Sequence, residues 1–172
     1  ACFADGGFAN YAAAVTSSHF CASERQFRLP LEYGGQRAGS TQWTVTGAGA
    51  LLVARGRGKV KIKSATFGKI TDYDITDVNN MGAAMAPAAA ETLCGFFDDT
   101  GKAPSDFDLI LTGDLGKVGS ELLLTLMKEE KRDIDEIHSD CGLNIYYLDR
   151  QDVKSGGSGC GCSASVLCSR IL

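Results

Sequence analysis

The chain has 172 residues, 44% of them hydrophobic, and a formal net charge of −4. This length and composition are typical of a soluble globular domain with a sizeable core. The mild negative charge and the lack of a basic stripe argue against nucleic acid as a partner. No run of about 18 apolar residues is present that could span a membrane. The first residues lack the basic region of a signal peptide, and the chain begins as an interior fragment would.

Seven cysteines in a core-rich chain indicate the reduced thiols of a cytosolic protein. Cys160 and Cys162 are separated by one residue, which is closer than the usual spacing of zinc ligands, and the two histidines are His19 and His138. We therefore predict no metal and no cofactor. A thiol-redox or metal protein built on the Cys160 and Cys162 pair remains the weakest of three functional hypotheses.

Hydrophobic periodicity predicts alternating helices and strands, which is the pattern of an α/β protein with a mixed or parallel sheet. Glycines 47 and 49 indicate a kink or a close backbone approach between two strands. In the first part of the chain, the predicted elements are a helix end at residues 1–9, a strand at 11–16 covered on both faces, strands at 41–46 and 50–54, and a half-exposed strand at 59–63. In the second part they are an Ala-rich helix from Asn80, a strand at 107–112, a helix at 118–131 and a strand at 141–147.

Polar residues follow two of these strands. Ser17, Ser18 and His19 come after the strand at 11–16, and Gly113 and Asp114 come after the strand at 107–112. In open α/β sheets, ligands bind beyond the carboxyl ends of the strands. Two alternatives stay open at this point, because His19 could be a structural histidine and Asp114 could be a helix cap.

A glycine-rich corner lies near the end of the sequence, at residues 156–163, and an apolar helix follows it. Gly157, Ser158, Gly159 and Cys160 are the candidate ligand contacts. The first N–H groups of a helix and the positive end of its dipole suit a carboxylate or a developing oxyanion. The alternative is that Gly and Cys occur here because a buried helix meets a sheet and bulk is forbidden. Together, the corners after residues 16, 112 and 156 are expected to converge on one pocket.

Several long motifs resemble the stage V sporulation protein AD family, and the similarity covers nearly the whole chain. The motifs are Thr16-Ser17-Ser18-His19, Glu24-Arg25-Gln26-Phe27-Arg28, Glu32-Tyr33-Gly34-Gly35-Gln36, Met81-Gly82-Ala83-Ala84-Met85-Ala86-Pro87-Ala88-Ala89-Ala90, Asp108-Leu109-Ile110-Leu111-Thr112-Gly113-Asp114-Leu115, Asp140-Cys141-Gly142 and Gly156-Gly157-Ser158-Gly159-Cys160.

The resemblance implies the layered fold of thiolases and ketoacyl synthases, in which two βαβαβαββ halves form a five-layered sandwich. On this mapping the fold is incomplete. Residues 1–57 would be the C-terminal part of the first half, and residues 58–172 would be most of the second half.

The resemblance also bears on catalysis. Condensing enzymes of this fold use a Cys nucleophile from the first half, a His and an Asn. The nucleophile region lies outside this sequence, the His position falls on Gly113 and the Asn position falls on Ser158. Gly cannot transfer a proton, and Ser is a poor replacement for an amide donor aimed at an oxyanion. The mapping therefore favours a protein that keeps the fold without the condensing reaction.

The function implied by the resemblance is the binding of dipicolinic acid, alone or as its calcium salt, and assistance with its uptake into the developing spore. Other stage V sporulation membrane proteins would be partners, the full-length protein would form a homodimer, and the location would be cytoplasmic and peripheral to the forespore or spore inner membrane. The alternative is an acyltransferase or condensing enzyme acting on acyl thioesters, with Cys160 or Cys162 as nucleophile and a thiol pKa lowered by the helix N-terminus.

Overall fold

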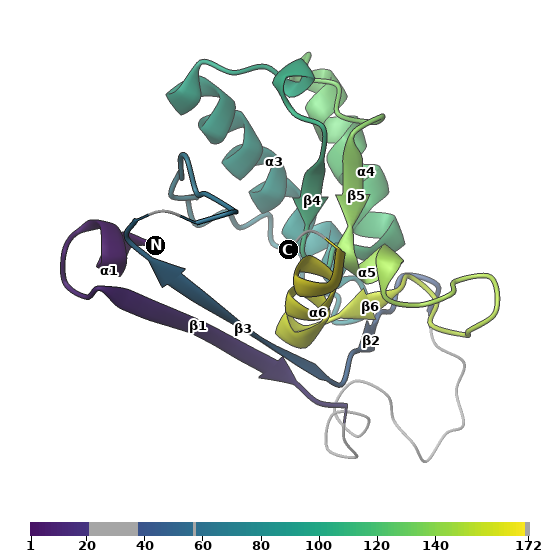
Figure 1. Cartoon of the computed structure of the whole chain (residues 1–172). Helices are drawn as coiled ribbons and strands as arrows, with labels where there is room; N and C mark the ends of the chain where they lie inside the picture. The colour runs from purple at the N-terminus through teal and green to yellow at the C-terminus, as the bar shows by residue number, and fades with distance from the viewer. Residues whose placement is uncertain (21–37, 57, 171–172) are drawn as a thin grey trace.

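The computed structural model describes residues 1–20, 38–56 and 58–170 (Figure 1). Helices alternate with short strands paired in parallel and antiparallel sheets, which confirms the predicted α/β class. The first helix, α1 (Cys2–Asp5), ends at Gly6 as predicted. The motifs between residues 21 and 37, with the two arginines considered as carboxylate partners, lie outside the described residues.

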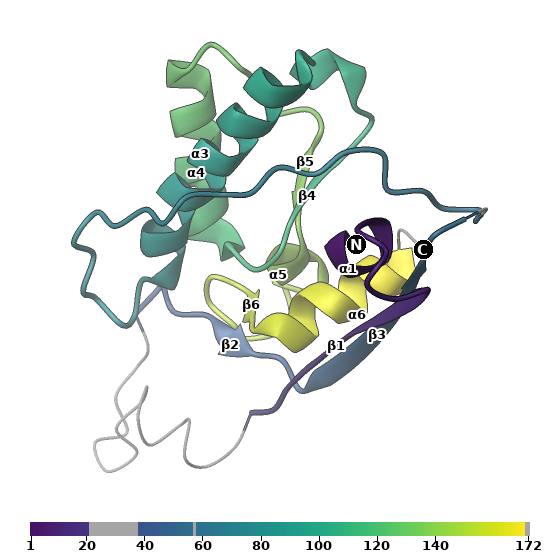
Figure 2. The ribbon, with the colours of Figure 1, turned by 90° about the vertical axis from the view of Figure 1, so that its left-hand side faces the viewer.

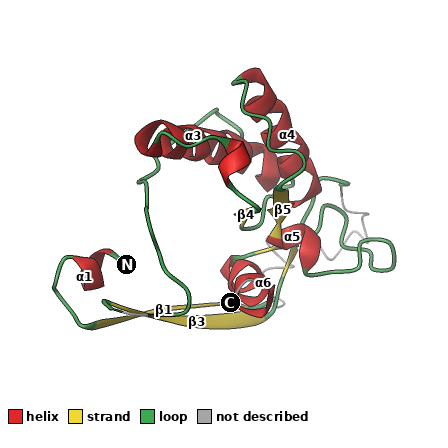
Figure 3. Ribbon diagram, turned by 45° about the horizontal axis from the view of Figure 1, so that its top comes forward, coloured by secondary structure: helices red, strands yellow, loops and turns green. Residues whose placement is uncertain are grey.

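The antiparallel pair of β1 (Tyr11–Ser18) and β3 (Gly47–Ala54) forms a long hairpin, with Ser18 opposite Gly47 at one end. Helix α6 (Cys160–Arg170) lies across one face of this hairpin (Figure 3). A Cβ atom added at Gly49 would come within 2.6 Å of the Cβ of Ala164. The predicted close backbone approach is therefore confirmed, and its cause is the packing of α6 on the strand.

The opposite face of the hairpin is exposed, so the prediction that the first strand is covered on both faces was wrong. Val15 is 72% exposed and Leu52 is 71% exposed. Figure 3 shows α6 on one side of the two strands and no described element on the other. An apolar sequence without polar alternation indicates a buried strand, but burial requires a second covering layer.

Two parallel pairs of strands lie beside α6. β2 (Trp43–Thr44) pairs with β6 (Gly157–Ser158), and β4 (Ile110–Thr112) pairs with β5 (His138–Asp140). The connection from β4 to β5 is helix α4 (Gly116–Glu129), which follows a corner of glycines as the sequence predicts. These pairings bring the ends of β4 and β6 to the start of α6.

Helix α3 (Met81–Thr100) packs against α4 and builds the larger core cluster with Leu123, Met127 and Ile134. Asn80 caps α3 by accepting a hydrogen bond from the N–H of Ala83 at 3.2 Å. A short 3-10 turn, η2 (Pro104–Asp106), connects α3 to β4. The segment between β3 and α3 runs along these helices (Figure 2), where the hydroxyl of Thr66 donates to Asp99 at 2.7 Å.

Two predicted strands are wrong. Residues 59–63 are irregular and exposed, because no strand of the described chain pairs with them. Residues 141–147 were predicted as a strand, but the strand β5 ends at Asp140 and helix α5 (Cys141–Asn144) follows. The side-chain amide of Asn144 donates to the carbonyl of Asp140 at 2.7 Å, and this contact favours the turn over an extended backbone.

Candidate functional site

Three segments that are distant in the sequence meet at the start of α6. Ser18, at the end of β1, accepts a hydrogen bond from the N–H of Gly161 at 2.9 Å. Asp114, after β4, accepts one from the N–H of Gly159 at 2.7 Å. The three predicted corners are therefore in contact, whereas the single pocket expected at their meeting point stays a prediction. We call this region, with Ser17, Gly113, Asp114 and residues 157–163, the glycine corner.

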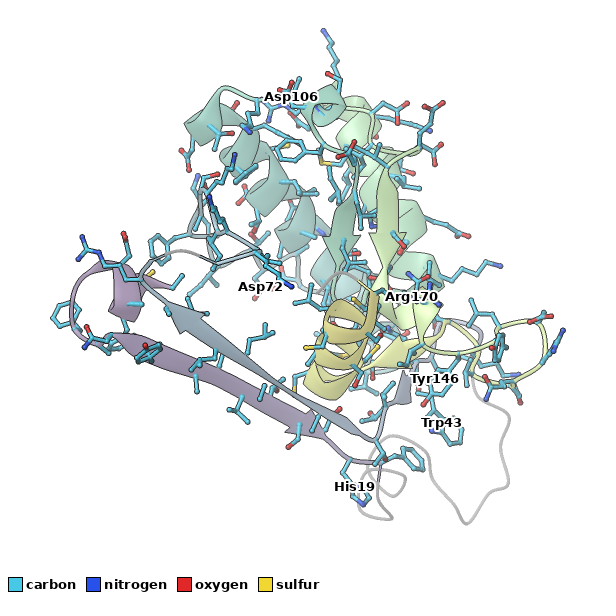
Figure 4. The ribbon with its side chains drawn as sticks, in the orientation of Figure 1. His19, Trp43, Asp72, Asp106, Tyr146 and Arg170 are labelled. Atoms are coloured by element: carbon cyan, nitrogen blue, oxygen red, sulfur yellow. The ribbon has the colours of Figure 1, made fainter. Side chains whose placement is uncertain are left out.

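The side chain of Ser17 is exposed, and the backbone carbonyl of Ser17 accepts a hydrogen bond from the thiol of Cys160 at 3.1 Å. Cys160 is also exposed, so this thiol faces solvent at the mouth of the corner. His19 is different. It is exposed at the end of β1, and its contact is a 3.4 Å approach of Nδ1 to the hydroxyl of Thr46 (Figure 4). No described contact links His19 to the corner.

The glycines of the corner have two physical causes. Gly159 has a φ of +96°, a backbone conformation that disfavours side chains. Gly161 is needed for packing, because a Cβ there would come within 2.4 Å of the carbonyl of Gly47 and of the Ser18 hydroxyl. The packing interpretation, in which side chains are excluded where a helix meets a sheet, therefore accounts for Gly161 without any ligand.

Asp114 does not have the helix-capping role that was one of its two sequence-based interpretations. The N-cap position of α4 is held by Leu115, so Asp114 does not cap that helix. Its half-buried carboxylate instead accepts from the residue that precedes α6. Asp114 thereby joins the loop after β4 to the start of α6.

The backbone donors of the corner are largely occupied. Asp114 takes the N–H of Gly159, Ser18 takes that of Gly161, and the N–H of Cys162 donates to the carbonyl of Gly159 at 3.0 Å. The N–H of Cys160 has no acceptor within the described part of the chain. An anion would therefore find one free N–H here, rather than the set that a helix start usually offers.

Two side chains that the sequence reasoning did not single out support the corner from below. Asp140 is fully buried and accepts from the N–H groups of Leu115 and Gly116, each at 3.0 Å, and from the hydroxyl of Thr112 at 2.7 Å. The Asp140-Cys141-Gly142 motif was a signal for it. Gln42 had no comparable signal, because it lies in an ordinary strand pattern.

Gln42 connects two segments of the corner. Its side-chain amide donates to the carbonyl of Asp114 at 2.6 Å and to the carbonyl of Gly157 at 2.9 Å. Gln42 is 7% exposed, and its Oε1 atom has no hydrogen-bond partner among the residues that the structure describes. A buried acceptor without a donor is unfavourable, so the two hydrogen bonds that the amide group donates are made at the cost of this oxygen.

The buried thiols are held in the protonated form. Burial raises the pKa of Cys162 to about 12, and the neighbouring charges of Asp114 and Asp140 act in the same direction. Burial likewise raises the pKa of Cys141 to about 11. The prediction that the helix start lowers a thiol pKa is therefore wrong for Cys162, because desolvation exceeds the dipole effect.

His138 is a further polar side chain next to the corner. Its Nε2 lies 2.9 Å from the hydroxyl of Thr112, which itself donates to Asp140. Burial lowers the pKa of His138, and the charges of Asp140 and Asp135 oppose that shift. The neutral imidazole is favoured, and since Thr112 donates elsewhere, Nε2 carries the proton of this hydrogen bond.

Ser158 and Gly113 are both closely packed within the corner. Ser158 is 5% exposed, and its Oγ lies 3.5 Å from the hydroxyl of Thr44. A Cβ added at Gly113 would come within 2.9 Å of the hydroxyl of Ser163. Among the described residues, no group of three or more His, Cys, Asp and Glu side chains could hold a metal ion.

A separate groove of about 600 Å³ lies between residues 66–73 and helices α3 and α4. Its described lining includes Phe67, Tyr73, Glu91, Asp98 and Glu129 and none of the predicted site residues. The corner is therefore a contact of three segments, and its use as a ligand pocket stays a prediction.

The fold and this corner define an α/β protein in which strand ends converge on a glycine-rich helix start. The family model of stage V sporulation protein AD matches residues 1–172. The chain is also 51% identical, over 168 residues, to the stage V sporulation protein AD of Bacillus subtilis (strain 168). The chain therefore belongs to the stage V sporulation protein AD family.

The alignment with the Bacillus subtilis protein covers 98% of this chain and 49% of that relative. The chain thus spans about half the length of the curated relative that it matches. No helix in the described residues is long and apolar enough to cross a membrane.

Proposed function

We propose that this chain is part of a non-catalytic binding protein of sporulation, which takes dipicolinic acid at the glycine corner and assists its uptake into the developing spore. The observation that carries the proposal concerns two positions of the corner, Gly113 and Cys162. Gly113 stands where the resemblance places a condensing His, and the thiol of Cys162 is buried with a pKa of about 12. Neither of these two positions supplies a group for general acid–base or thiolate catalysis, and the exposed Cys160 is the thiol that the alternative function would have to use.

The corner has features that suit a flat carboxylate ligand. The N–H of Cys160 is free of a described acceptor, and the exposed thiol of Cys160 and the side chain of Ser17 line the entrance. The start of an eleven-residue helix adds the positive end of its dipole. We take Ser17, Ser18, Gly113, Asp114 and Gly157 to Cys160 as the ligand-binding residues, and we keep His19 as a more distant candidate.

Calorimetric titration of dipicolinate tests this function. Ser158→Leu fills the corner and should abolish saturable binding, with Ser105→Leu as the matched control, because Ser105 is exposed in η2. Because Ser158 is buried, its substitution could also disturb the fold. Cys160→Tyr is therefore a second variant, which obstructs the corner from an exposed position. A folded wild-type protein that gives no heat, or a blocked variant that binds as the wild type does, would count against the proposal.

The alternative function, acyl transfer by a cysteine, makes a different prediction for the thiols. Cys160 is the exposed candidate, whereas Cys141 and Cys162 are buried with raised pKa values. Rapid alkylation of Cys160 near neutral pH, faster than that of exposed Cys2, would favour the enzyme. Equal rates for the two exposed thiols would favour the binding protein.

Three further statements belong to this proposal. We infer a thiolase-like layered fold, with residues 1–57 and 58–172 in its first and second halves. The partners are other stage V sporulation membrane proteins and, in the full-length protein, a second copy of the chain. The location is peripheral to the forespore or spore inner membrane. Co-sedimentation of the protein with forespore membranes, and its release from them by high salt, would support this location.

A further inference from the structure

A basic segment follows strand β3 and takes no part in the contacts of the glycine corner. Residues 55–63 contain no acidic residue, although the whole chain has a formal net charge of −4. Arg55, Lys59, Lys61 and Lys63 are exposed, and no hydrogen bond or ion pair among the described residues involves their side chains. Pairing within the described chain therefore does not account for these charges.

Apolar side chains alternate with the lysines in this segment. Val60 is 63% exposed and Ile62 is 62% exposed, and each has a lysine on both sides in the sequence. Residues 59–63 pair with no described strand, so the face of a sheet accounts for neither the lysines nor the apolar residues. Such side chains would be stabilised by a surface that presents negative charge in front of an apolar layer.

Aromatic side chains lie at the same end of the hairpin. Tyr11, the first residue of β1, pairs with Ala54, the last residue of β3, so Arg55 leaves the sheet beside it. Phe3 and Phe8 precede β1, and both are exposed although their rings form an edge-to-face pair at 6.2 Å. Figure 1 and Figure 2 show α1 at this end of the two strands. We name the following set the basic–aromatic end: Phe3, Phe8, Tyr11, Arg55, Lys59, Val60, Lys61, Ile62 and Lys63.

Negative charge is sparse at this end of the molecule. Across residues 1–18 and 47–63, the acidic residue in the described part of the chain is Asp5, in α1. The next acidic residue after Lys63 is Asp72, and the residues between them run along α3, where Thr66 donates to Asp99 at 2.7 Å. The basic–aromatic end is therefore positive in a chain that is negative as a whole.

We propose that the basic–aromatic end binds directly to an anionic lipid surface, with its cations on the headgroups and its apolar side chains at the boundary of the acyl layer. Clusters of about four or more Lys and Arg are attracted to anionic lipid, and aromatic side chains favour that boundary. Nucleic acid would offer the negative charge without the apolar layer. The inference rests on the proposed peripheral location, to which it adds the segment and the lipid chemistry, and it does not involve the glycine corner.

Co-sedimentation with vesicles tests the inference. The chain is mixed with vesicles made of equal parts of phosphatidylglycerol and phosphatidylcholine, and separately with vesicles of phosphatidylcholine alone. We expect binding to the anionic vesicles to be tighter by roughly tenfold or more. Because charge attraction is screened by salt, this binding should weaken steeply between about 0.15 M and about 1 M salt.

Charge-neutral variants locate the surface. The triple variant Lys59→Gln, Lys61→Gln, Lys63→Gln should bind anionic vesicles about 100-fold more weakly, since each charge near such a surface accounts for roughly fivefold. The matched control changes the net charge equally at three exposed lysines of the α3–α4 part, as Lys102→Gln, Lys117→Gln, Lys131→Gln, and should bind within a few-fold of the wild type. Ile62→Ser should weaken binding several-fold and leave the salt dependence unchanged.

Four results would overturn the inference: a folded wild type that does not bind anionic vesicles, equal binding to the two kinds of vesicle, equal losses in the two triple variants, or tighter binding to duplex DNA than to anionic vesicles. Circular dichroism and urea unfolding check that each variant is folded. Calorimetric titration of dipicolinate separates this inference from the proposed binding function, because the variant at positions 59, 61 and 63 should keep the wild-type affinity. Vesicle binding without any dipicolinate binding would remove the proposed ligand alone.

Discussion

At the scale of single residues, Asp140 is the side chain on which the corner depends most. It is fully buried and accepts three hydrogen bonds, two of them from the backbone at the start of α4. Asp140→Ala leaves these donors buried without an acceptor, and we expect a loss of about 3 kcal/mol in the free energy of unfolding. Urea unfolding measures this loss.

Asp140→Asn keeps one acceptor oxygen, so its free energy of unfolding should lie between that of the wild type and that of Asp140→Ala. Asp106→Ala is the control, since Asp106 is exposed and its removal should change the free energy of unfolding by far less. Equal effects of the alanine substitutions at 106 and 140 would contradict the structural role assigned to Asp140.

His138 gives a pH test, because it is partly buried. Burial lowers the pKa of His138 in the folded chain below its ordinary value of 6.5. As the pH falls through 6.5, the unfolded chain takes up a proton before the folded chain does, so the free energy of unfolding decreases until the folded pKa is passed. Above that window His138 contributes no penalty.

We therefore expect wild-type stability to fall between pH 7 and pH 5 more steeply than that of His138→Gln. Urea titrations at several pH values, compared variant by variant, give the slopes. A His138→Gln curve parallel to the wild type would show that this histidine is not held neutral by the fold.

At the scale of elements, helix α3 contains two glycines with opposite roles. A Cβ at Gly82 would come within 2.7 Å of the backbone of α4, whereas a Cβ at Gly95 would have its nearest neighbour at 3.9 Å. Gly82→Ala should destabilise the chain by about 1–3 kcal/mol, because the two helix backbones would have to separate. Gly95→Ala should stabilise it by about 0.5–1 kcal/mol through helix propensity. Thermal unfolding distinguishes the two, and a loss of stability in both variants would contradict the packing described here.

Local patterns predicted the elements whose causes are local. The Asn80 cap and the apolar spacing of α3, and the glycines before α4, correspond to observed helix starts. The strand predicted at 59–63 failed because alternation indicates a strand only where a partner strand exists. Residues 141–147 form no strand because side-chain bonds of Asp140 and Asn144 favour a turn.

The candidate site was predictable in part for the same reason. Strand ends and glycine corners indicated Ser18, Asp114 and Gly159, which the structure brings into contact. Gln42 was not predictable, because its role depends on two carbonyls from segments about 70 and 115 residues away in the sequence. The occupied donors at the start of α6 also required the structure, since they depend on which side chains arrive there.

At the scale of the whole molecule, the hairpin face opposite α6 is a broad apolar surface with Tyr11, Val15 and Leu52 exposed. Leu52→Lys should change the free energy of unfolding by less than about 0.5 kcal/mol and should raise the concentration at which the chain stays monomeric. Its neighbour Leu51, half-buried on the α6 side of the strand, is the matched control, and Leu51→Lys should destabilise clearly. Light scattering and urea unfolding measure both effects, and an equally destabilised Leu52→Lys would show that this face is covered.

The most direct test of the central claim, that the glycine corner is where dipicolinate binds, is amide hydrogen exchange with and without the ligand. We predict slower exchange at the end of β1, at residues 113–116 and at the start of α6, with Ca²⁺ present. Exchange in the groove beside α3 should not change. Protection confined to that groove, or no protection in the presence of saturating dipicolinate, would contradict the assignment of the corner as the binding site.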